Sequence, residues 1–453
     1  MTTPVLERTS TSTESVSTRA YVYAIDPSAE QANHLRSHIG GSRYAYNTLL
    51  GLVKDNWDGN RAKKDAGIEV AQADWVDTSH FGLLNLWAEH RDELAPWWAE
   101  NGSSTYNDAT QRLAKAIGNW RKGRAKFPTF KSKGQGGSVR FMGPAVRLVD
   151  SHHARISRIG EVKTYESTRK LFRHLERGTG RIVAATVTQR CGKWQVSFTV
   201  EVTRQVPATR APGKIVGVDV GIMTLYTGAT ADGVHVLDVD NPRHFVRAQK
   251  KLARAQRIAA RRQGPGPGKV PSKRWRKANG RVQKVHAGVA NARKNLIHET
   301  TSMLAKSYDV IVIENLNIKG MVKNPSLAKH IADAGWGEFG RQLEYKTAWY
   351  GSTLVRVDTF YPSSKTCSQC QTVKATLSLE MRMFHCEACG LVIDRDLNAA
   401  INLARKGLPG TSSGTGRGGE VSPAQQKLAA TAHPDEASTD PSRDVDGVGD
   451  ASA

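Results

Sequence analysis

The cysteines of this chain are grouped, and their spacing is typical of a metal site. Four of the five form two C-x-x-C pairs, Cys367 with Cys370 and Cys386 with Cys389, separated by fifteen residues. Each C-x-x-C turn can bring two thiolates onto one metal, and a hairpin between the pairs would return the second pair. Four thiolates leave no open coordination position, so the spacing predicts one structural Zn²⁺. The alternative is a set of redox dithiols or free thiols.

Three carboxylates occupy sequence positions that a catalytic or metal-binding role would explain. Asp219 lies in the apolar stretch VGVDVG, Glu314 ends the apolar run VIVIE, and Asp396 precedes the helical pattern LNAAINLARKG. Acids in apolar strands are usually paired with a cation or belong to a site that needs them. For Asp396, a helix N-cap is the simpler interpretation. If the three converged, they could bind two Mg²⁺ ions about 4 Å apart and hydrolyse a phosphodiester. Spacing alone does not establish that convergence.

The charge of the chain indicates a polyanionic partner. Its 453 residues carry a formal net charge of +23, and residues 241 to 298 contain no Asp or Glu. This segment has helical spacing on both sides of the break GPGPG, which predicts an antiparallel helical hairpin. A basic segment is often only a solvated surface, but without acids its repulsion would be unrelieved unless nucleic acid bound there. The candidate contacts are Arg247, Lys250, Lys251, Arg254, Arg257, Arg261 and Arg262.

Hydropathy argues against a membrane protein. No apolar run approaches the roughly 20 residues that span a bilayer, and the N-terminus lacks the apolar core of a signal peptide. We therefore expect a cytoplasmic protein with no membrane partner.

The pattern along the chain predicts an α/β protein. Residues 1–18 and the tail 407–453 are expected to be disordered. A strand is expected over residues 19–25, then a helix capped by Asp26 and two helical stretches separated by Gly40-Gly41. Residues 182–202 read as a hairpin that turns at Cys191-Gly192, with Cys191 a partly buried thiol. A second hairpin around ATADGVHVLDV, an interior strand ending at Glu314, a helix over 336–350 and the strand TLVRVD follow.

Several motifs taken together resemble one family. GVDVG, VIENLNIKGM, DAGWGEFGRQLEYKTAWYG, FYPSSKTCSQC and CEACGLVIDRDLNAAINLARKG are similar to the TnpB (OrfB) proteins of bacterial insertion sequences. These proteins are RNA-guided DNA nucleases and the ancestors of type V CRISPR effectors. The resemblance covers roughly residues 19 to 406 in order, and the stretch from Trp57 to Trp120 is its least diagnostic part.

The resemblance implies a domain organisation. A β-rich wedge domain is expected over residues 19–210, with a helical recognition insertion at about 27–125. A RuvC nuclease domain of RNase H-like fold is expected over 211–406, carrying the basic helical hairpin at about 242–308 and a zinc ribbon at about 361–393.

The resemblance also implies roles for the residues. Asp219 matches the first RuvC carboxylate and Glu314 the second, and the family's D-x-N-A-A element identifies Asp396, rather than Asp394, as the third. The family's zinc ligands match Cys367, Cys370, Cys386 and Cys389. One departure is Gln371, where a Gly commonly follows the first pair, which could alter the turn but not the ligands.

The implied partners are a structured guide RNA and double-stranded target DNA, bound by a monomer associated with the bacterial nucleoid. The protein would hold the RNA–DNA heteroduplex by its backbone, read a short motif beside the target and cut both strands with two Mg²⁺ ions. A compact type V CRISPR effector with the same chemistry is the main alternative. A nuclease-inactive RNA-guided repressor would have lost acids that are intact here. A structural RNA-binding protein with a zinc ribbon would leave Asp219 and Glu314 unexplained.

Overall fold

The computed structural model describes residues 13–133, 137–206, 213–266, 269–378 and 380–408. They form two compact units: an N-terminal unit of residues 16–204, and a C-terminal unit of the described residues from 205 to 408 together with 13–15. Residues 1–12 and 409–453, which hold most of the two segments expected to be disordered, lie outside the described residues. Within the described part, no helix has both the length and the apolar character needed to cross a membrane.

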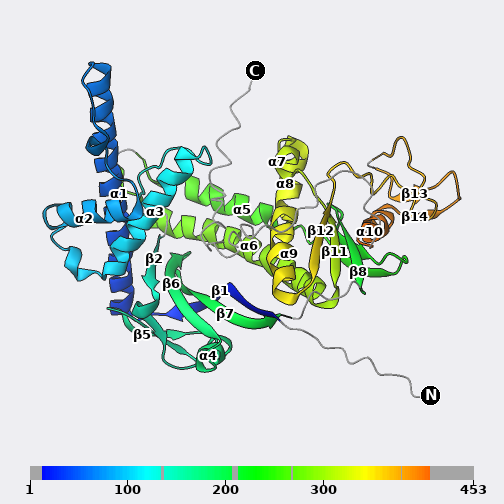
Figure 1. Ribbon diagram of the computed structural model, residues 1–453, viewed down its shortest axis with the longest axis horizontal. Helices are drawn as coiled ribbons and strands as arrows, with labels where there is room; N and C mark the ends of the chain where they lie inside the picture. Colours follow the sequence, from blue (N-terminus) through cyan, green and yellow to red (C-terminus); the bar gives the residue numbers. More distant parts are fainter. Residues whose placement is uncertain (1–12, 134–136, 207–212, 267–268, 379, 409–453) are drawn as a thin grey trace. The chain divides into compact units, whose positions relative to one another are not determined.

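The N-terminal unit is built on one seven-stranded sheet with helices attached (Figure 1). Its strands follow the order β2-β6-β7-β1-β5-β4-β3. They are β1 (Thr13–Asp26), β2 (Gly137–Met142), β3 (Val146–Leu148), β4 (His153–Ile156), β5 (Gly160–Thr164), β6 (Gly180–Arg190) and β7 (Lys193–Val206). The helices are α1 (Ala29–Asp65), α2 (His80–Leu94), α3 (Ser103–Arg121) and α4 (Arg169–Glu176), with short 3-10 turns at Gln72–Asp74, Trp98–Glu100 and Gly143–Ala145.

The hairpin expected around Cys191-Gly192 is confirmed. β6 and β7 pair antiparallel up to Arg190 and Lys193, leaving a two-residue turn. Cys191 and Gly192 both have positive φ, 52° and 77°, as a tight turn that matches the twist of its strands requires. Cys191 is half-buried, as expected.

The start of the chain differs from expectation in two places. Strand β1 begins at Thr13, inside the segment expected to be disordered. The helix that follows is capped by Ser28 and not by Asp26: the Ser28 hydroxyl accepts a hydrogen bond from the Gln31 amide (3.2 Å), and the Gln31 side chain accepts one from the Ser28 amide (3.0 Å). Such a reciprocal capping box satisfies two backbone donors at once, which Asp26 followed by Pro27 does not offer.

The two helical stretches expected on either side of Gly40-Gly41 are one helix. α1 runs unbroken for 37 residues. A glycine inside a helix costs about 1 kcal/mol relative to alanine, but it ends the helix only where the backbone turns left-handed, and neither glycine has positive φ. A Cβ at Gly41 would lie 3.2 Å from Nδ2 of Asn101, so the small residue accommodates the side chain that precedes α3.

The C-terminal unit contains a five-stranded mixed sheet, in the order β10-β9-β8-β11-β12, and a separate two-stranded sheet. The strands are β8 (Ile215–Val220), β9 (Thr224–Ala229), β10 (His235–Asp240), β11 (Val310–Glu314), β12 (Thr353–Val357), β13 (Met383–His385) and β14 (Val392–Asp394). The helices are α5 (His244–Ala260), α6 (Lys273–Ser307), α7 (Ile318–Met321), α8 (Pro325–Ala334), α9 (Trp336–Tyr350) and α10 (Arg395–Lys406). The expected hairpin, interior strand, 336–350 helix and following strand are confirmed.

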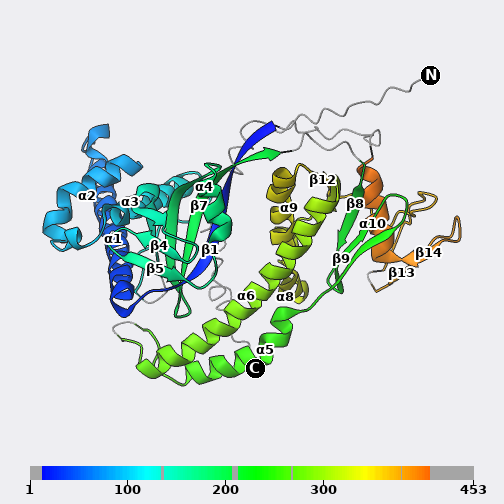
Figure 2. The same ribbon diagram turned by 90° about the horizontal axis from the view of Figure 1, so that it is seen from below.

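The basic helical hairpin is also confirmed, with α5 and α6 lying side by side (Figure 2). Asp333, at the end of α8, binds both helices of this hairpin. Its carboxylate accepts hydrogen bonds from the Phe245 amide (2.9 and 3.0 Å) and from the Arg293 guanidinium (3.0 Å). The residue is 6 % exposed. A nearly buried carboxylate is therefore satisfied by the free amides at the start of α5 and by a cation of α6.

Helix α10 packs very closely on β8. A Cβ built on Gly217 would overlap the carbonyl oxygen of Ala400 and the amide nitrogen of Ala404, and it would lie 2.8 Å from the Leu403 Cβ. A Cβ on Gly407 would lie 2.7 Å from a methyl of Val312. The hydrogen at position 217 is thus what lets the helix backbone rest directly on the strand.

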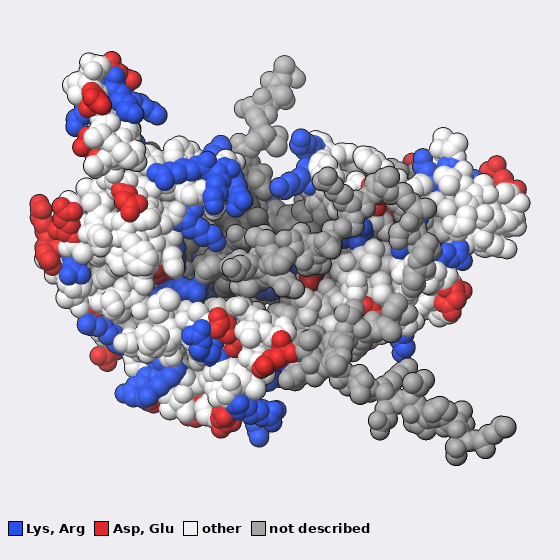
Figure 3. Space-filling view, viewed as in Figure 1, with Lys and Arg blue, Asp and Glu red and all other residues white. Residues whose placement is uncertain are grey.

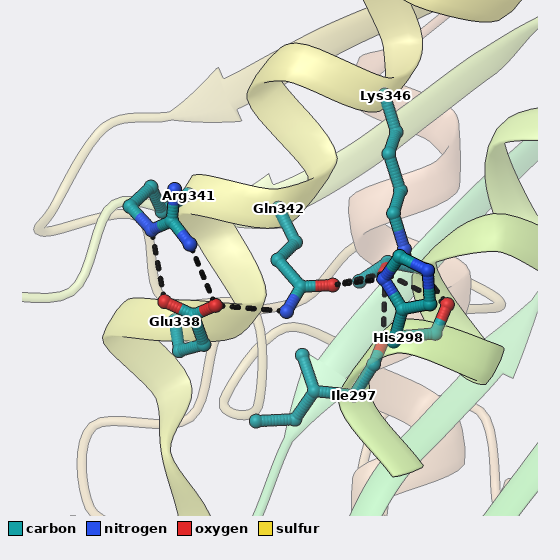
Figure 4. A network of polar contacts seen from close by, with 7 residues as sticks. Ile297, His298, Glu338, Arg341, Gln342 and Lys346 are labelled. Atoms are coloured by element: carbon teal, nitrogen blue, oxygen red, sulfur yellow. Dashed lines mark hydrogen bonds and ion pairs between the residues drawn. The ribbon is translucent and has the colours of Figure 1, made fainter. Parts of the chain in front are cut away.

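A buried lysine joins α6 to α9 (Figure 4). Lys346 is 1 % exposed, and its Nζ donates to the His298 carbonyl (2.7 Å), to Thr301 Oγ1 (2.6 Å) and to Ser302 Oγ (2.9 Å). Three oxygen acceptors satisfy its three donors. Burial, with a smaller contribution from Lys306, lowers the pKa of Lys346 to about 8, against the attraction of Glu338.

We expect Gly217→Ala to lower the free energy of unfolding by about 1–3 kcal/mol, because the methyl group must displace a helix backbone. Gly288→Ala is the matched control, since Gly288 lies in α6 with nothing within 4 Å of its Cβ position. It should raise stability by about 0.5–1 kcal/mol. Urea unfolding of both variants measures the difference, and equal effects would contradict the close packing.

Stability should rise with pH between about 8 and about 10.5, the interval between the folded and ordinary pKa values of Lys346. In that window the unfolded chain binds the extra proton, so raising the pH favours the folded state by about 1.4 kcal/mol per unit. Lys346→Met should flatten this part of the profile, whereas Lys294→Met, at an exposed position of α6, should not. Urea midpoints measured from pH 7.5 to 10.5 test it; parallel profiles for the protein and Lys346→Met would refute the assignment.

Candidate active site and metal centre

The first two predicted acids lie at the ends of neighbouring parallel strands. β11 pairs with β8 through Ile313 opposite Val218, so the next residue of each strand is Glu314 and Asp219. Parallel strands in this register direct the two side chains to the same face at the same sheet edge. The four apolar residues before Glu314 are buried, which fixes the register and hence the pair.

The third acid is supplied by α10. Asp396 lies in the first turn of this helix, and one of its carboxylate oxygens is 3.7 Å from the Cβ position of Gly221, just beyond the end of β8. The packing at Gly217 therefore brings the start of α10 to the edge where β8 ends.

The N-cap role that we considered for Asp396 belongs to Asp394. The Asp394 carboxylate accepts hydrogen bonds from the amides of Asp396 and Leu397, both at 2.9 Å. This leaves the Asp396 side chain available, and its Oδ1 accepts from the Arg395 guanidinium at 3.0 and 3.2 Å. Asp394, exposed to solvent, starts the helix rather than joining the acidic cluster.

The electrostatics show that the three acids interact. Burial raises the pKa of Asp219 well above its usual range, and the negative charges of Glu314 and Asp396 raise it further, with Arg395 opposing them. Burial also raises the pKa of Glu314, against a hydrogen bond donated by the Ser363 hydroxyl. A buried carboxyl with two further acids beside it gains most from a bound cation, and carboxylate oxygens are the donors that Mg²⁺ prefers.

The four cysteines come together as the spacing predicts. All four Sγ atoms lie within 4.8 Å of one another, the one group of this kind among the described residues. Cys367 Sγ is 3.6 Å from Cys389 Sγ, and Cys370 Sγ is 3.5 Å from Cys386 Sγ. A tetrahedral ion with bonds of about 2.3 Å places its sulfurs about 3.8 Å apart, so the cluster can hold such a metal.

The departure at Gln371 leaves the turn intact. Gln371 has a φ of 63°, and Gly390, at the same place after the second pair, has a φ of 77°. The amides of Gln371 and Gly390 donate to the carbonyls of Cys367 and Cys386, at 3.0 and 2.9 Å. The two turns thus have the same form, with glutamine in a left-handed position that glycine more often occupies.

Residues that the sequence did not single out connect the cysteine segment to α10. Buried Asn398 accepts from the Ser368 amide (2.9 Å) and donates to the Thr366 carbonyl (2.7 Å). Asn402, also buried, donates to the carbonyls of Ser363 (2.9 Å) and Thr366 (2.7 Å). Two asparagines four residues apart, in a helix whose other buried residues are apolar, were the signal that could have identified this contact.

The predicted nucleic-acid contacts lie on the basic hairpin. All seven basic residues, on α5 or just after it, are exposed. Leu252 and Ala259 of the same helix are buried, so one face packs and the basic face is left to solvent.

The fold is similar to that of a compact type V effector. A solved structure titled "Cryo-EM structure of the Cas12f1-sgRNA-target DNA complex" superposes with a TM-score of 0.50, over 86% of this chain and 99% of that chain. The identity is 13%, so the likeness concerns the fold. Residues 336–403 match the model "Cas12f1-like, TNB domain".

Sequence relatives define the family more closely. A protein of Streptomyces pristinaespiralis named "Putative RNA-guided DNA endonuclease" is 33% identical over 91% of this chain and 97% of its own length. InsQ of Escherichia coli K12, named in the same way, is 28% identical over 86% of this chain and 92% of its own. Residues 197–325 match the OrfB model described as "Probable transposase", and residues 17–62 match its "Helix-turn-helix domain". The chain belongs to the TnpB (OrfB) family, which confirms the resemblance inferred from the motifs.

Loss of the asparagine contacts should loosen the metal centre. Asn398→Ala removes the acceptor of the buried Ser368 amide, which should cost about 1–3 kcal/mol of stability. Protein loaded with Zn²⁺ should then lose the ion faster to a colorimetric chelator. Asn295→Ala, at an exposed position of α6, should not change the rate; equal release by both variants would show that α10 does not support the centre.

Proposed function

We propose that this protein is a transposon-encoded, RNA-guided DNA endonuclease, which binds a guide RNA and cleaves double-stranded DNA beside a short target-adjacent motif. The names of its relatives describe such endonucleases. The observation that carries the proposal is geometric. Asp219 and Glu314 follow paired residues of two parallel strands, and a carboxylate oxygen of Asp396 lies 3.7 Å from the Cβ position of Gly221, just beyond the first of these strands. A costly cluster of acids in a chain of net charge +23 is explained if the protein cuts the polyanion that it binds.

In this proposal the three carboxylates hold two Mg²⁺ ions. When bound, the ions supply Lewis-acid stabilisation of the phosphate and an activated water at neutral pH. Ser363 orients Glu314 through its hydroxyl, and Arg395 restrains Asp396 beside it. Asp394 keeps α10 in place by capping it, so the acid two residues later is free to act as a ligand.

The four cysteines would hold one structural Zn²⁺. Four thiolate ligands leave no open position on the metal, which suits a structural role. The bound metal would make the cysteine segment rigid, and the two asparagines of α10 would connect that segment to the helix that bears Asp396. The ribbon would thus act as a positioning element.

The domains follow the same proposal. The C-terminal unit would be the RuvC nuclease of RNase H-like fold, in which acids from two strands and a helix meet at one sheet edge. The N-terminal unit would be the wedge with its helical recognition part, and the exposed cations of α5 would contact nucleic-acid backbone without reading sequence.

The alternatives are addressed by particular observations. The 33% identity to an RNA-guided DNA endonuclease over 91% of the chain, and the match to the OrfB model, favour the transposon-encoded protein over a CRISPR effector. A nuclease-inactive repressor would have no need of a buried Asp219 whose pKa is raised by burial and by the charges of Glu314 and Asp396. Sequencing the co-purifying RNA separates a transposon-end transcript from a repeat-spacer RNA.

Asp219→Asn should abolish cutting while leaving RNA retention unchanged. Loss of a metal ligand removes several kcal/mol of transition-state stabilisation, so cleavage of a matching plasmid in Mg²⁺ should fall by about a thousandfold or more. The protein purified with its own RNA is the material, and gel analysis of plasmid products is the measurement.

Asp232→Asn is the matched control, because Asp232 is an exposed acid in the turn between β9 and β10. It should cut at the unmodified rate, and omission of Mg²⁺ should stop both proteins. Undiminished cutting by Asp219→Asn would refute the assignment of the acids.

A further inference from the structure

A basic pocket lies in the N-terminal unit, outside the candidate active site. Its volume is about 350 Å³. Three elements form it: β1, β7 and the helix α4 with the residue that follows it. The lining residues are Arg19, Tyr21, Lys170, Arg173, His174, Arg177 and Arg204.

Most of the cations that line the pocket have no acidic partner among the described residues. Five of its seven lining residues are Arg or Lys, and none is an acid. Elsewhere on the N-terminal unit, the face drawn in Figure 3 shows basic and acidic groups interspersed. Among the described residues, no ion pair involves Lys170, Arg173, Arg177 or Arg204. Cations gathered in a concave site repel one another, so the pocket favours an anionic ligand.

The two ring residues are positioned within this basic environment. The Thr179 hydroxyl donates to the His174 carbonyl (3.3 Å), which leaves its oxygen to accept from His174 Nδ1 (3.1 Å) and directs Nε2 away from that contact. The Tyr21 ring is 6.4 Å from the His174 ring, centroid to centroid. Burial lowers the pKa of His174, as do Arg204, Arg19 and Arg177, which favours the neutral imidazole.

The shape of the pocket restricts the ligand. A pocket of this volume falls in the range that takes small ligands, about 300–1,000 Å³. Single-stranded RNA can turn a base out of its stack, and aromatic and histidine rings are the usual surfaces that receive it.

We propose that this pocket binds an unpaired nucleotide of the guide RNA, with its phosphates against the arginines and its base beside Tyr21 and His174. This rests on the proposed function only in that the protein carries a guide RNA. The site is separate in sequence and in unit from the acids that would cut DNA.

The test compares two double variants that lose the same charge. Arg173→Gln with Arg177→Gln alters the pocket; Arg155→Gln with Arg169→Gln alters two exposed arginines of the same unit that do not line it. Full-length protein freed of RNA is titrated with the transcript that co-purifies with the unmodified protein, at several salt concentrations. The pocket variant should bind about tenfold more weakly or worse, with a salt slope lower by about 1.4 for two single-strand contacts. The control should stay within about twofold.

Further measurements make the outcomes decisive. Thermal unfolding of both variants checks the fold, and Lys170→Gln with Arg173→Gln repeats the test at a second pair of positions. Equal RNA affinity of the pocket and control variants overturns this inference alone. Normal RNA binding with weakened binding of target DNA to the loaded protein also overturns it, because the occupant is then DNA. If the unmodified protein itself binds no RNA, the proposed function fails, and this inference with it.

Discussion

The site in the C-terminal unit depends on one contact, the packing of α10 on β8 at Gly217. The parallel pairing of β8 and β11 by itself brings Asp219 and Glu314 to one edge. The direct contact of the helix backbone with the strand brings Asp396 to the same edge, beside Gly221. The three acids are therefore supplied by β8, β11 and α10, and the absence of a side chain at Gly217 sets the distance between the helix and the sheet.

Helix α10 also contacts the segment that leads into the first cysteine pair. One face of α10 carries Asn398 and Asn402, which bind the backbone around Thr366, and Ser363 in that loop also reaches Glu314. The loop that leads into the first cysteine pair thus touches both an acid of β11 and the helix that bears Asp396. The cysteine segment and the acids are thus linked through a few hydrogen bonds, and loss of one partner of a buried hydrogen bond costs more than the bond itself contributes.

How far the sequence predicted this arrangement depended on the range of the interactions. Local signals were sufficient for the β6–β7 turn at Cys191-Gly192, for the strand ending at Glu314 and for the four cysteines, because turn geometry, continuous apolarity and C-x-x-C spacing are properties of neighbouring residues. The motif match favoured Asp396 over Asp394, which spacing could not separate. Helix ends and breaks were predicted less well: Ser28 displaced Asp26 as the cap, and α1 continued through Gly40-Gly41, because packing against Asn101 is not visible in the local sequence. The Gly217 contact, the hydrogen bonds of Asn398 and Asn402, and the basic pocket join residues far apart in the chain. No local sequence pattern predicts them.

The contact at Gly217 also limits how this protein can evolve. The atoms that a side chain there would strike first, the Ala400 carbonyl oxygen and the Ala404 amide nitrogen, belong to the backbone. No substitution in α10 can make a backbone atom smaller, so position 217 has no partner with which it could change in a compensating pair. We expect suppressors of a Gly217 variant to be rare in α10 and, where they arise, to act by raising the stability of the fold elsewhere.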